Sequence, residues 1–237
     1  MSARWTLHGG GIEAARRHFG KGDWIDLSTG INPHPWPGAA NMTFDWQRLP
    51  EPEALARLEA AAAAYFGVDA RHVCAAPGSE IGLRLTGMLV GGAARHLAPS
   101  YRTHGEMFAE CRPIDREATR RHDGTLILAN PNNPDGYAIS ADRLGTLLNG
   151  RGPNGWLLVD EAFADADPTA SIAPSVDDGH RLIVFRSFGK FFGLAGVRLG
   201  FVIAPQAIVA ALRDRLGAWP LSAAAIAIGT AAYADRD

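Results

Sequence analysis

Cysteine and lysine are scarce in this chain, with two of each among 237 residues. Cys74 and Cys111 lie far apart in the sequence, and neither belongs to a Cys-x-x-Cys pair, which favours a reducing cytoplasm. The eight histidines form no ligand-spaced cluster with one another or with cysteine. No metal site is therefore predicted.

Strong charge bias and long apolar runs are also missing. A formal net charge of −2 with mixed signs gives no broad basic field for nucleic acid or an anionic membrane. The uncharged run at residues 218–234 is mostly alanine and falls short of the roughly 20 strongly apolar residues that a membrane span needs, so a packed helix is predicted. A charged leader followed by an apolar core is absent from the amino terminus, so we expect no signal peptide.

Helical and strand patterns alternate along most of the chain. Helices are predicted at residues 53–66, 79–89, 102–109, 141–148 and 207–216, and strands at 72–75, 95–98, 126–129, 157–159, 182–185 and 199–203. Such alternation predicts a mainly parallel sheet between helices, a three-layer α/β/α fold. We expect an N-terminal arm at residues 1–26, a large domain at 27–205, and helices from 206 to 237.

One segment, SFGKFFGLAGVRLGF at residues 187–201, combines a lysine, an arginine and small residues. It follows an apolar run that predicts a buried strand, so Lys190 would lie at the carboxyl edge of the sheet, where catalytic groups of α/β folds collect. A lysine there can form a Schiff base with a carbonyl cofactor, and Ser187 and Arg198 can hold a phosphate nearby. An isolated Gly-Lys pair would more simply be a turn with a solvated lysine.

Three other segments also place polar residues after predicted strands. In GWLLVDEAF, an apolar run leads into Asp160, although solvated acids can also follow a strand. In TLILANPNNPDG, another apolar run leads into a turn that presents Asn133. In HVCAAPGSEIGLRL, the residues Gly78, Ser79 and Glu80 open a helix, and the free N–H groups of a helix start bind phosphate. Ser and Glu are also ordinary helix-opening residues.

Taken in order, these segments resemble the fold-type I pyridoxal-phosphate enzymes of the aminotransferase class I/II group. The resemblance implies that Lys190 bonds to the cofactor, Asp160 pairs with the pyridine nitrogen, and Asn133 reaches the ring oxygen. It implies the following cofactor-binding set: Gly78, Ser79, Glu80, Tyr101, Asn133, Asp160, Ser187, Lys190 and Arg198. Phe163 departs from the pattern, because many relatives have a tyrosine there whose phenol donates to the ring oxygen. His34, His104 and His122 are interpreted as surface or structural residues.

The amino terminus narrows the resemblance. LHGGGIEAARRHFG and WIDLSTGINPHPWP are similar to the opening of the threonine-phosphate decarboxylases of cobalamin biosynthesis, which share the histidinol-phosphate aminotransferase scaffold. This implies that His8, Gly9 and Asn32 help Asn133 to bind the substrate. A flexible glycine arm and an ordinary turn before Pro33 are the alternative interpretation of these residues.

The resemblance implies a lyase that decarboxylates O-phospho-L-threonine to (R)-1-aminopropan-2-yl phosphate, acting as a cytoplasmic homodimer. Two alternatives stay open, because the cofactor site alone does not separate a decarboxylase from an aminotransferase acting on histidinol phosphate or a related amino acid. The second alternative is a pyridoxal-phosphate-binding fragment without turnover. Relatives carry a small C-terminal domain with the arginine that holds the substrate carboxylate, and we expect this chain to end before it.

Overall fold

A seven-stranded sheet forms the centre of residues 9–120 and 122–235, the parts of the chain that the computed structural model describes. The strands are β1 (Val73–Ala76), β2 (Ala93–Leu97), β3 (Glu110–Ile114), β4 (Thr125–Ala129), β5 (Leu157–Asp160), β6 (Leu182–Ser187) and β7 (Gly200–Ile203). Their order is β1-β7-β6-β5-β4-β2-β3, and only the two pairings of β7 are antiparallel. The predicted mainly parallel sheet is therefore confirmed.

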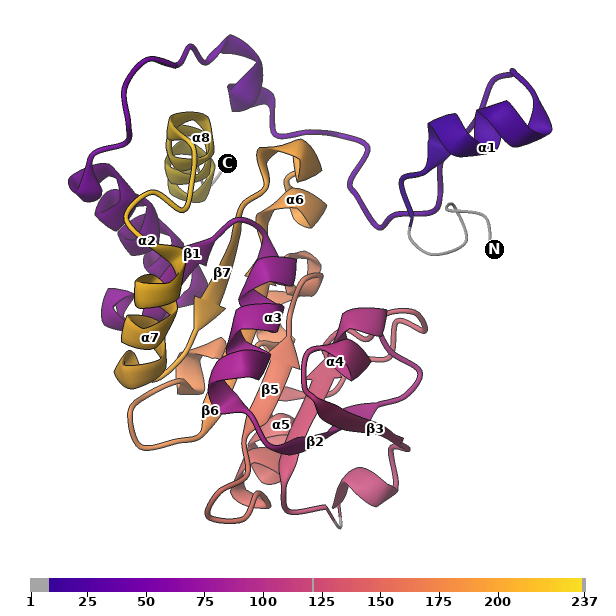
Figure 1. Ribbon diagram of the computed structural model, residues 1–237, viewed down its shortest axis with the longest axis vertical. Helices are drawn as coiled ribbons and strands as arrows, with labels where there is room; N and C mark the ends of the chain where they lie inside the picture. The colour runs from indigo at the N-terminus through magenta and orange to yellow at the C-terminus, as the bar shows by residue number, and fades with distance from the viewer. Residues whose placement is uncertain (1–8, 121, 236–237) are drawn as a thin grey trace.

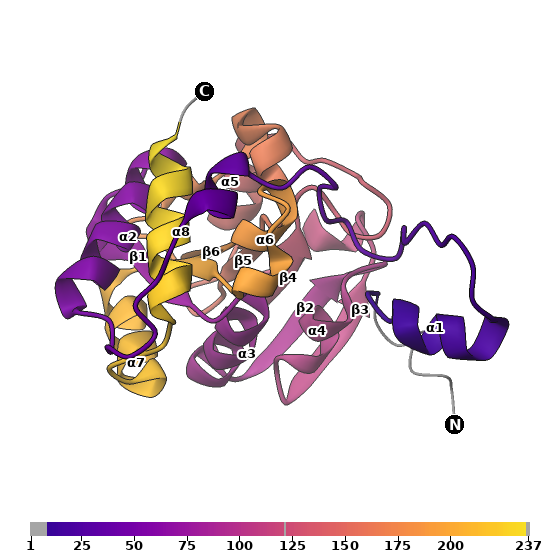
Figure 2. The same cartoon turned by 90° about the horizontal axis from the view of Figure 1, so that it is seen from above.

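Helices cover both faces of this sheet, as Figures 1 and 2 show. They are α1 (Ile12–Phe19), α2 (Pro52–Phe66), α3 (Ser79–Val90), α4 (Arg102–Glu106), α5 (Ala141–Asn149), α6 (Phe188–Phe191), α7 (Gln206–Leu216) and α8 (Ala223–Ala234). Core residues of α2, α5 and α8 pack in one apolar cluster, and those of α3 and α7 pack in a second. The three-layer arrangement follows from these two clusters on opposite sides of the sheet.

The central strands are apolar on both faces because both are covered. In β5, Leu157 and Val159 join the first cluster while Leu158, between them, joins the second. Successive strand residues point to opposite faces, so a strand buried on both sides reads as a continuous apolar run. This is why the sequence pattern locates these strands.

The alanine-rich run near the end of the chain forms α8, a packed helix as predicted. It lies beside α2 (Figure 2), and Tyr233 on it is 3% exposed. Among the helices of the described residues, none is long and apolar enough to cross a membrane. The proposed domain boundary at residue 205 stays a prediction.

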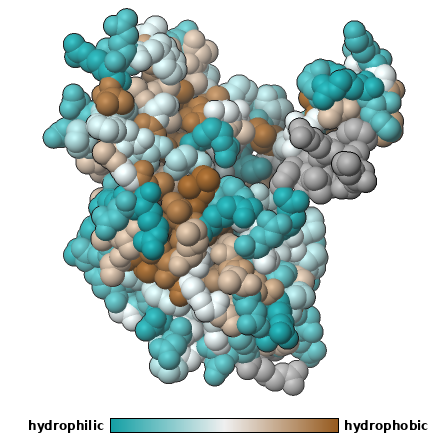
Figure 3. All heavy atoms as spheres, viewed as in Figure 1, coloured by the Kyte–Doolittle hydropathy of each residue, from teal (hydrophilic) through white to brown (hydrophobic). Residues whose placement is uncertain are grey.

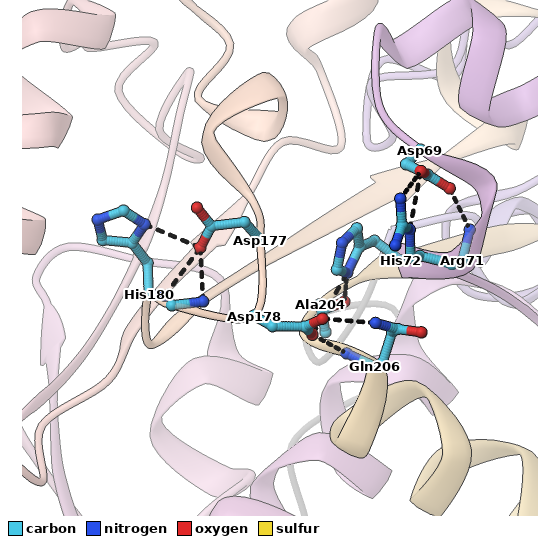
Figure 4. Close-up of polar contacts among 9 residues, drawn as sticks. Asp69, Arg71, His72, Asp177, Asp178, His180, Ala204 and Gln206 are labelled. Atoms are coloured by element: carbon cyan, nitrogen blue, oxygen red, sulfur yellow. Dashed lines mark hydrogen bonds and ion pairs between the residues drawn. The ribbon is translucent and has the colours of Figure 1, made fainter.

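One edge of the sheet gathers the ends of several strands. Parallel strands β1, β4, β5 and β6 finish there, and antiparallel β7 begins there, since Gly200 pairs with both Ala76 and Ser187. At the opposite edge, Asp178 accepts a 2.8 Å hydrogen bond from the backbone N–H of Gln206 at the start of α7 (Figure 4). The loop that precedes β6 is thereby fixed far from the first edge.

A buried ion pair joins β6 to the loop after β5. Arg186 is 2% exposed; its Nη1 donates to Glu161 Oε2 at 2.9 Å and its Nη2 donates to Asp165. The guanidinium carbon also lies 4.7 Å from the centre of the Phe66 ring. Burial raises the pKa of both carboxyls, although the nearby Arg186 charge opposes that rise.

We expect Arg186→Met to lower the free energy of unfolding by about 3–5 kcal/mol, because two buried carboxyls lose their cation. Carboxyls with a raised folded-state pKa favour folding at low pH, and that contribution is lost as pH rises through the raised value. The decrease in the free energy of unfolding caused by Arg186→Met should therefore be larger at pH 8 than at pH 5. Urea unfolding at the two pH values measures both effects.

Arg215→Met serves as the matched control, since Arg215 is exposed on α7, and its effect should stay within about 0.5 kcal/mol. A comparable decrease in the free energy of unfolding in both variants would show that the buried ion pair stabilises the fold no more than an exposed arginine does.

Candidate active site

Two adjoining cavities open at the edge of the sheet where the parallel strands β1, β4, β5 and β6 end. The inner one has a volume of about 100 Å³ and the outer one about 730 Å³. The inner cavity is lined by Ser79, Glu80, Tyr101, Ala129, Asn133, Asp160, Ala162, Phe163 and Lys190. Tyr101, Asn133, Phe163 and Lys190 also line the outer cavity, so they form the boundary between the two. Most of the side chains that the sequence singled out therefore meet at one place.

Lys190 lies in the short helix α6, directly after β6. Burial lowers the pKa of its ammonium group, the negative charge of Asp160 opposes this shift, and the positive charge of Arg198 adds to it. Its Nζ lies 5.4 Å from the centre of the Phe163 ring. A lysine whose amine is more readily neutral is a better nucleophile.

Asp160 ends β5 and is 5% exposed. Its Oδ1 accepts a 3.1 Å hydrogen bond from the N–H of Ala162, and its Oδ2 lies 3.0 Å from Nε2 of His104. The carboxylate is thus held on both oxygens and still borders the inner cavity. A fixed carboxylate of this kind can hold a proton on a ligand nitrogen that faces it.

His104 is the functional candidate that sequence reasoning missed. It was interpreted as a surface or structural histidine, but it is fully buried and contacts Asp160 directly. Its ring also makes an edge contact with Tyr101, with centroids 5.8 Å apart. Tyr101 lies directly before α4 and His104 three residues later within it, so the spacing indicated their mutual contact but not the contact of His104 with Asp160.

Tyr101 is fixed by Glu80, at the start of α3. The phenol donates to Glu80 Oε2 at 2.9 Å, and Thr103 and Arg84 also donate to this carboxylate. Burial raises the pKa of Glu80, but the hydrogen bonds from Thr103, Arg84 and Tyr101 outweigh it, so the net pKa is lowered. Glu80 therefore stays ionised and orients the aromatic ring at the cavity wall.

A candidate anion site is formed where α3 begins. Gly78 has φ 88°, which favours glycine, and a methyl group on it would lie 2.7 Å from Nη2 of Arg198. Arg198 itself has φ 54° and is the non-glycine residue with a left-handed backbone in the described ranges. Ser187 lies beside this turn, because its register partner Gly200 packs against the backbone N of Ser79. A cation, a hydroxyl and the free N–H groups of a helix start thus converge.

Asn133 is presented by a loop that two other asparagines hold in place. Asn130 is 1% exposed and exchanges hydrogen bonds with the backbone of Ile139 at 2.8 and 2.9 Å. Asn132 donates from Nδ2 to the carbonyl of Pro99 at 3.0 Å, which ties this loop to the segment before Tyr101. The sequence identified the outward residue, Asn133, but not its two anchors.

The substrate residues predicted near the amino terminus, His8, Gly9 and Asn32, lie in different places. Gly9 lines the outer cavity, and a methyl group on it would lie 2.0 Å from the carbonyl oxygen of Ser28. His8 falls outside the described residues. Asn32 bonds to the Lys190 loop and, within the described part of the chain, is not among the residues that line either cavity. Their contacts with a substrate stay predictions.

Phe163 packs its ring edge against Gly30, where a methyl group would lie 2.4 Å from Cε1 of the phenylalanine. The ring therefore closes the cavity on the side of the arm. Across the described ranges, no group of at least three His, Cys, Asp or Glu side chains is arranged to hold a metal ion.

Comparisons with known proteins agree with this geometry. The family model for aminotransferase class I and II matches residues 100–237. A threonine-phosphate decarboxylase from Sinorhizobium sp. is 42% identical over 236 residues, covering 95% of this chain and 71% of the relative. Histidinol-phosphate aminotransferase 1 from Bradyrhizobium diazoefficiens is 30% identical, covering 90% of this chain and 66% of the relative.

The fold has a close counterpart among solved structures. Histidinol-phosphate aminotransferase from Sinorhizobium meliloti, in complex with pyridoxal-5'-phosphate, superposes with a TM-score of 0.81 and 22% sequence identity, covering 100% of this chain and 71% of that one. The chain belongs to the aminotransferase class I and II family and, within it, groups with the threonine-phosphate decarboxylases.

Proposed function

We propose that the protein uses pyridoxal phosphate to decarboxylate O-phospho-L-threonine, yielding (R)-1-aminopropan-2-yl phosphate for cobalamin biosynthesis. The observation that carries the proposal is that Lys190 and Asp160 line one cavity, whose wall also includes Ser79 at the start of the candidate anion site. The choice of substrate rests on the higher identity to a threonine-phosphate decarboxylase, 42%, than to a histidinol-phosphate aminotransferase, 30%.

The residues present fit the cofactor. The guanidinium of Arg198 lies close to Gly78, since a methyl group there would be 2.7 Å from Nη2. This cation and the N–H groups at the start of α3 are therefore placed to hold a phosphate together with Ser79 and Ser187. Asp160 would face the ring nitrogen, Asn133 the ring oxygen, and Tyr101 the flat side of the ring. When bound, pyridoxal phosphate supplies an aldehyde and a ring that accepts electrons from the substrate.

The carboxylate and the lysine have separate tasks. Asp160, oriented by His104, holds a proton on the nitrogen that it faces, because a nearby negative charge favours the protonated form. Lys190 first acts as a nucleophile and later returns a proton to the α-carbon of the substrate. Burial favours the neutral amine that the first task needs.

The groups that bind the two ends of the substrate would decide which bond at its α-carbon breaks. A decarboxylase would break the bond to the carboxylate, whereas an aminotransferase would break the bond to hydrogen. We propose that Gly9 and Asn133, which line the outer cavity, together with His8 and Asn32, bind the phosphorylated side chain. A doubly charged phosphate needs several donors to offset its loss of solvation.

We further propose that the protein acts as a homodimer in the cytoplasm. The arm projects from the body in Figure 1, and Phe19, Ile25 and Leu27 on it are strongly exposed. Apolar side chains also gather around α3 on the face in Figure 3. Met88, which lies on α3, is 69% exposed. Apolar surface of this kind marks a place where another chain can pack.

Borohydride reduction of the cofactor-loaded protein should fix the cofactor to the peptide that contains Lys190. Peptide mass spectrometry can decide this cleanly, since Lys21 is the one other lysine in the sequence and is exposed on the arm. Lys190→Ala should give no labelled peptide. Labelling of Lys21 in the native protein would exclude the assignment.

Phe163→Tyr should lower the pKa of the nitrogen that joins Lys190 to the cofactor. A phenol near the ring oxygen stabilises the oxyanion, which belongs to the deprotonated form, so deprotonation becomes easier. A spectral pH titration of the loaded protein reads this midpoint. An unchanged or raised midpoint would mean that the side chain at position 163 does not reach the ring oxygen.

Incubation of the loaded protein with O-phospho-L-threonine should release carbon dioxide without any keto acid. Lys190→Ala should reduce the rate by at least about 100-fold, because both the nucleophile and the proton donor are lost. Amino transfer to 2-oxoglutarate without carbon dioxide would instead favour the aminotransferase. A bound-cofactor spectrum with neither reaction would favour a binding fragment.

A further inference from the structure

The segment from Gly30 to Trp36 runs along the loop that carries Lys190. The backbone N–H of Asn32 donates to the carbonyl of Lys190 at 2.9 Å, and the side-chain Nδ2 of Asn32 donates to the carbonyl of Phe191 at 2.9 Å. Four residues after Asn32, beyond the turn through His34, the N–H of Trp36 donates to the carbonyl of Phe192 at 2.9 Å. Three successive peptide groups of the lysine loop are thus bonded to one segment.

This segment is fixed on its own side as well. Oδ1 of Asn32 accepts a 2.9 Å hydrogen bond from the N–H of His34, which locks the side chain in place. Gly193, with φ 66°, lets the two backbones approach closely, because a methyl group there would lie 2.7 Å from the carbonyl oxygen of Asn32. Contact between Gly30 and the Phe163 ring holds the start of the segment.

The lysine loop needs such support because α6 is only four residues long. Phe188 and Phe192 stack at 4.6 Å and anchor the loop in the core. Asn32 holds the opposite side of the loop, towards the arm. We propose that Asn32 is a positioning residue for Lys190, which sets where its amine lies by bonding to the backbone of the lysine and of the residue after it.

The position of the amine matters because charged and titratable groups surround it. Asp160 attracts the ammonium and Arg198 repels it, while Glu80 and the phenol of Tyr101 line the same cavity. Burial is the largest influence and lowers the pKa of Lys190. If the loop moves towards solvent, the pKa of Lys190 should therefore rise towards that of an exposed lysine.

This positioning role is separate from the contact with the substrate proposed for Asn32 and is compatible with it, because it uses only one of the two amide hydrogens of Asn32. The side-chain oxygen and one amide hydrogen of Asn32 are already engaged with backbone groups. The inference rests on the proposed function only in taking Lys190 as the residue that bonds to the cofactor.

Competitive labelling of the cofactor-free protein with acetic anhydride, from about pH 6 to about pH 11, tests this directly. Peptide mass spectrometry then gives the reactivity of Lys190 at each pH, with the exposed Lys21 as an internal standard. In Asn32→Leu, which keeps the size of the side chain but removes its hydrogen bonds, the Lys190 titration should move upward by at least about half a pH unit. Asn32→Ser, the milder change, should move it in the same direction.

His34→Ala is the matched control, because it removes an exposed side chain from the same segment and keeps the backbone donor to Asn32. Its Lys190 titration should equal that of the native protein. An unchanged titration in both Asn32 variants, or an equal shift in His34→Ala, would overturn the proposal. Labelling with acetic anhydride needs no cofactor or substrate, so its outcome does not depend on the proposed function. A failure of the proposed function would instead appear as borohydride labelling of Lys21.

Discussion

The ion pair between Arg186 and Glu161 joins the ends of β5 and β6 directly beneath the site. Glu161 follows Asp160 in the chain, and Arg186 comes four residues before Lys190, so one buried contact fixes the backbone that carries both groups. The N–H of Glu161 also donates to the carbonyl of Phe185 at 2.9 Å, which continues the strand pairing to the edge of the sheet. The core therefore restricts relative motion of the lysine and the carboxylate. The other side of the lysine loop is held by the segment from Gly30 to Trp36.

Much of the fold could be predicted because covered strands leave a continuous apolar run in the sequence. The apolar run at β4 and the amphipathic pattern at α5 predicted the bounds of these two elements to within a residue or two. β3 was missed because it is an edge strand with exposed polar residues and a proline. α1 was missed because no residue on it is buried, and the helix predicted at residues 102–109 ends at Glu106, where the chain turns into β3.

The candidate site was predictable where a polar residue directly follows an apolar strand. That rule located Asp160, Asn133 and Lys190, which the structure brings to shared cavity walls. It gave no information on contacts between distant segments. His104 meets Asp160 across 56 residues, and Asn32 meets Phe191 across 159, and neither separation leaves a periodic or local signal in the sequence. The resemblance assigned Glu80 to the cofactor; in the structure Glu80 lines the inner cavity and also holds Tyr101, a contact that the sequence did not predict.

The central proposal is that Lys190, Asp160 and the turn at Gly78 and Ser79 together bind pyridoxal phosphate at one edge of this sheet. A crystal structure of the protein loaded with pyridoxal phosphate tests that proposal most directly. The account predicts density joining Lys190 to the cofactor, the ring nitrogen facing Asp160, and the phosphate between the Gly78–Ser79 turn and Arg198. A phosphate bound away from that turn, or a ring nitrogen with no contact to Asp160, would contradict it.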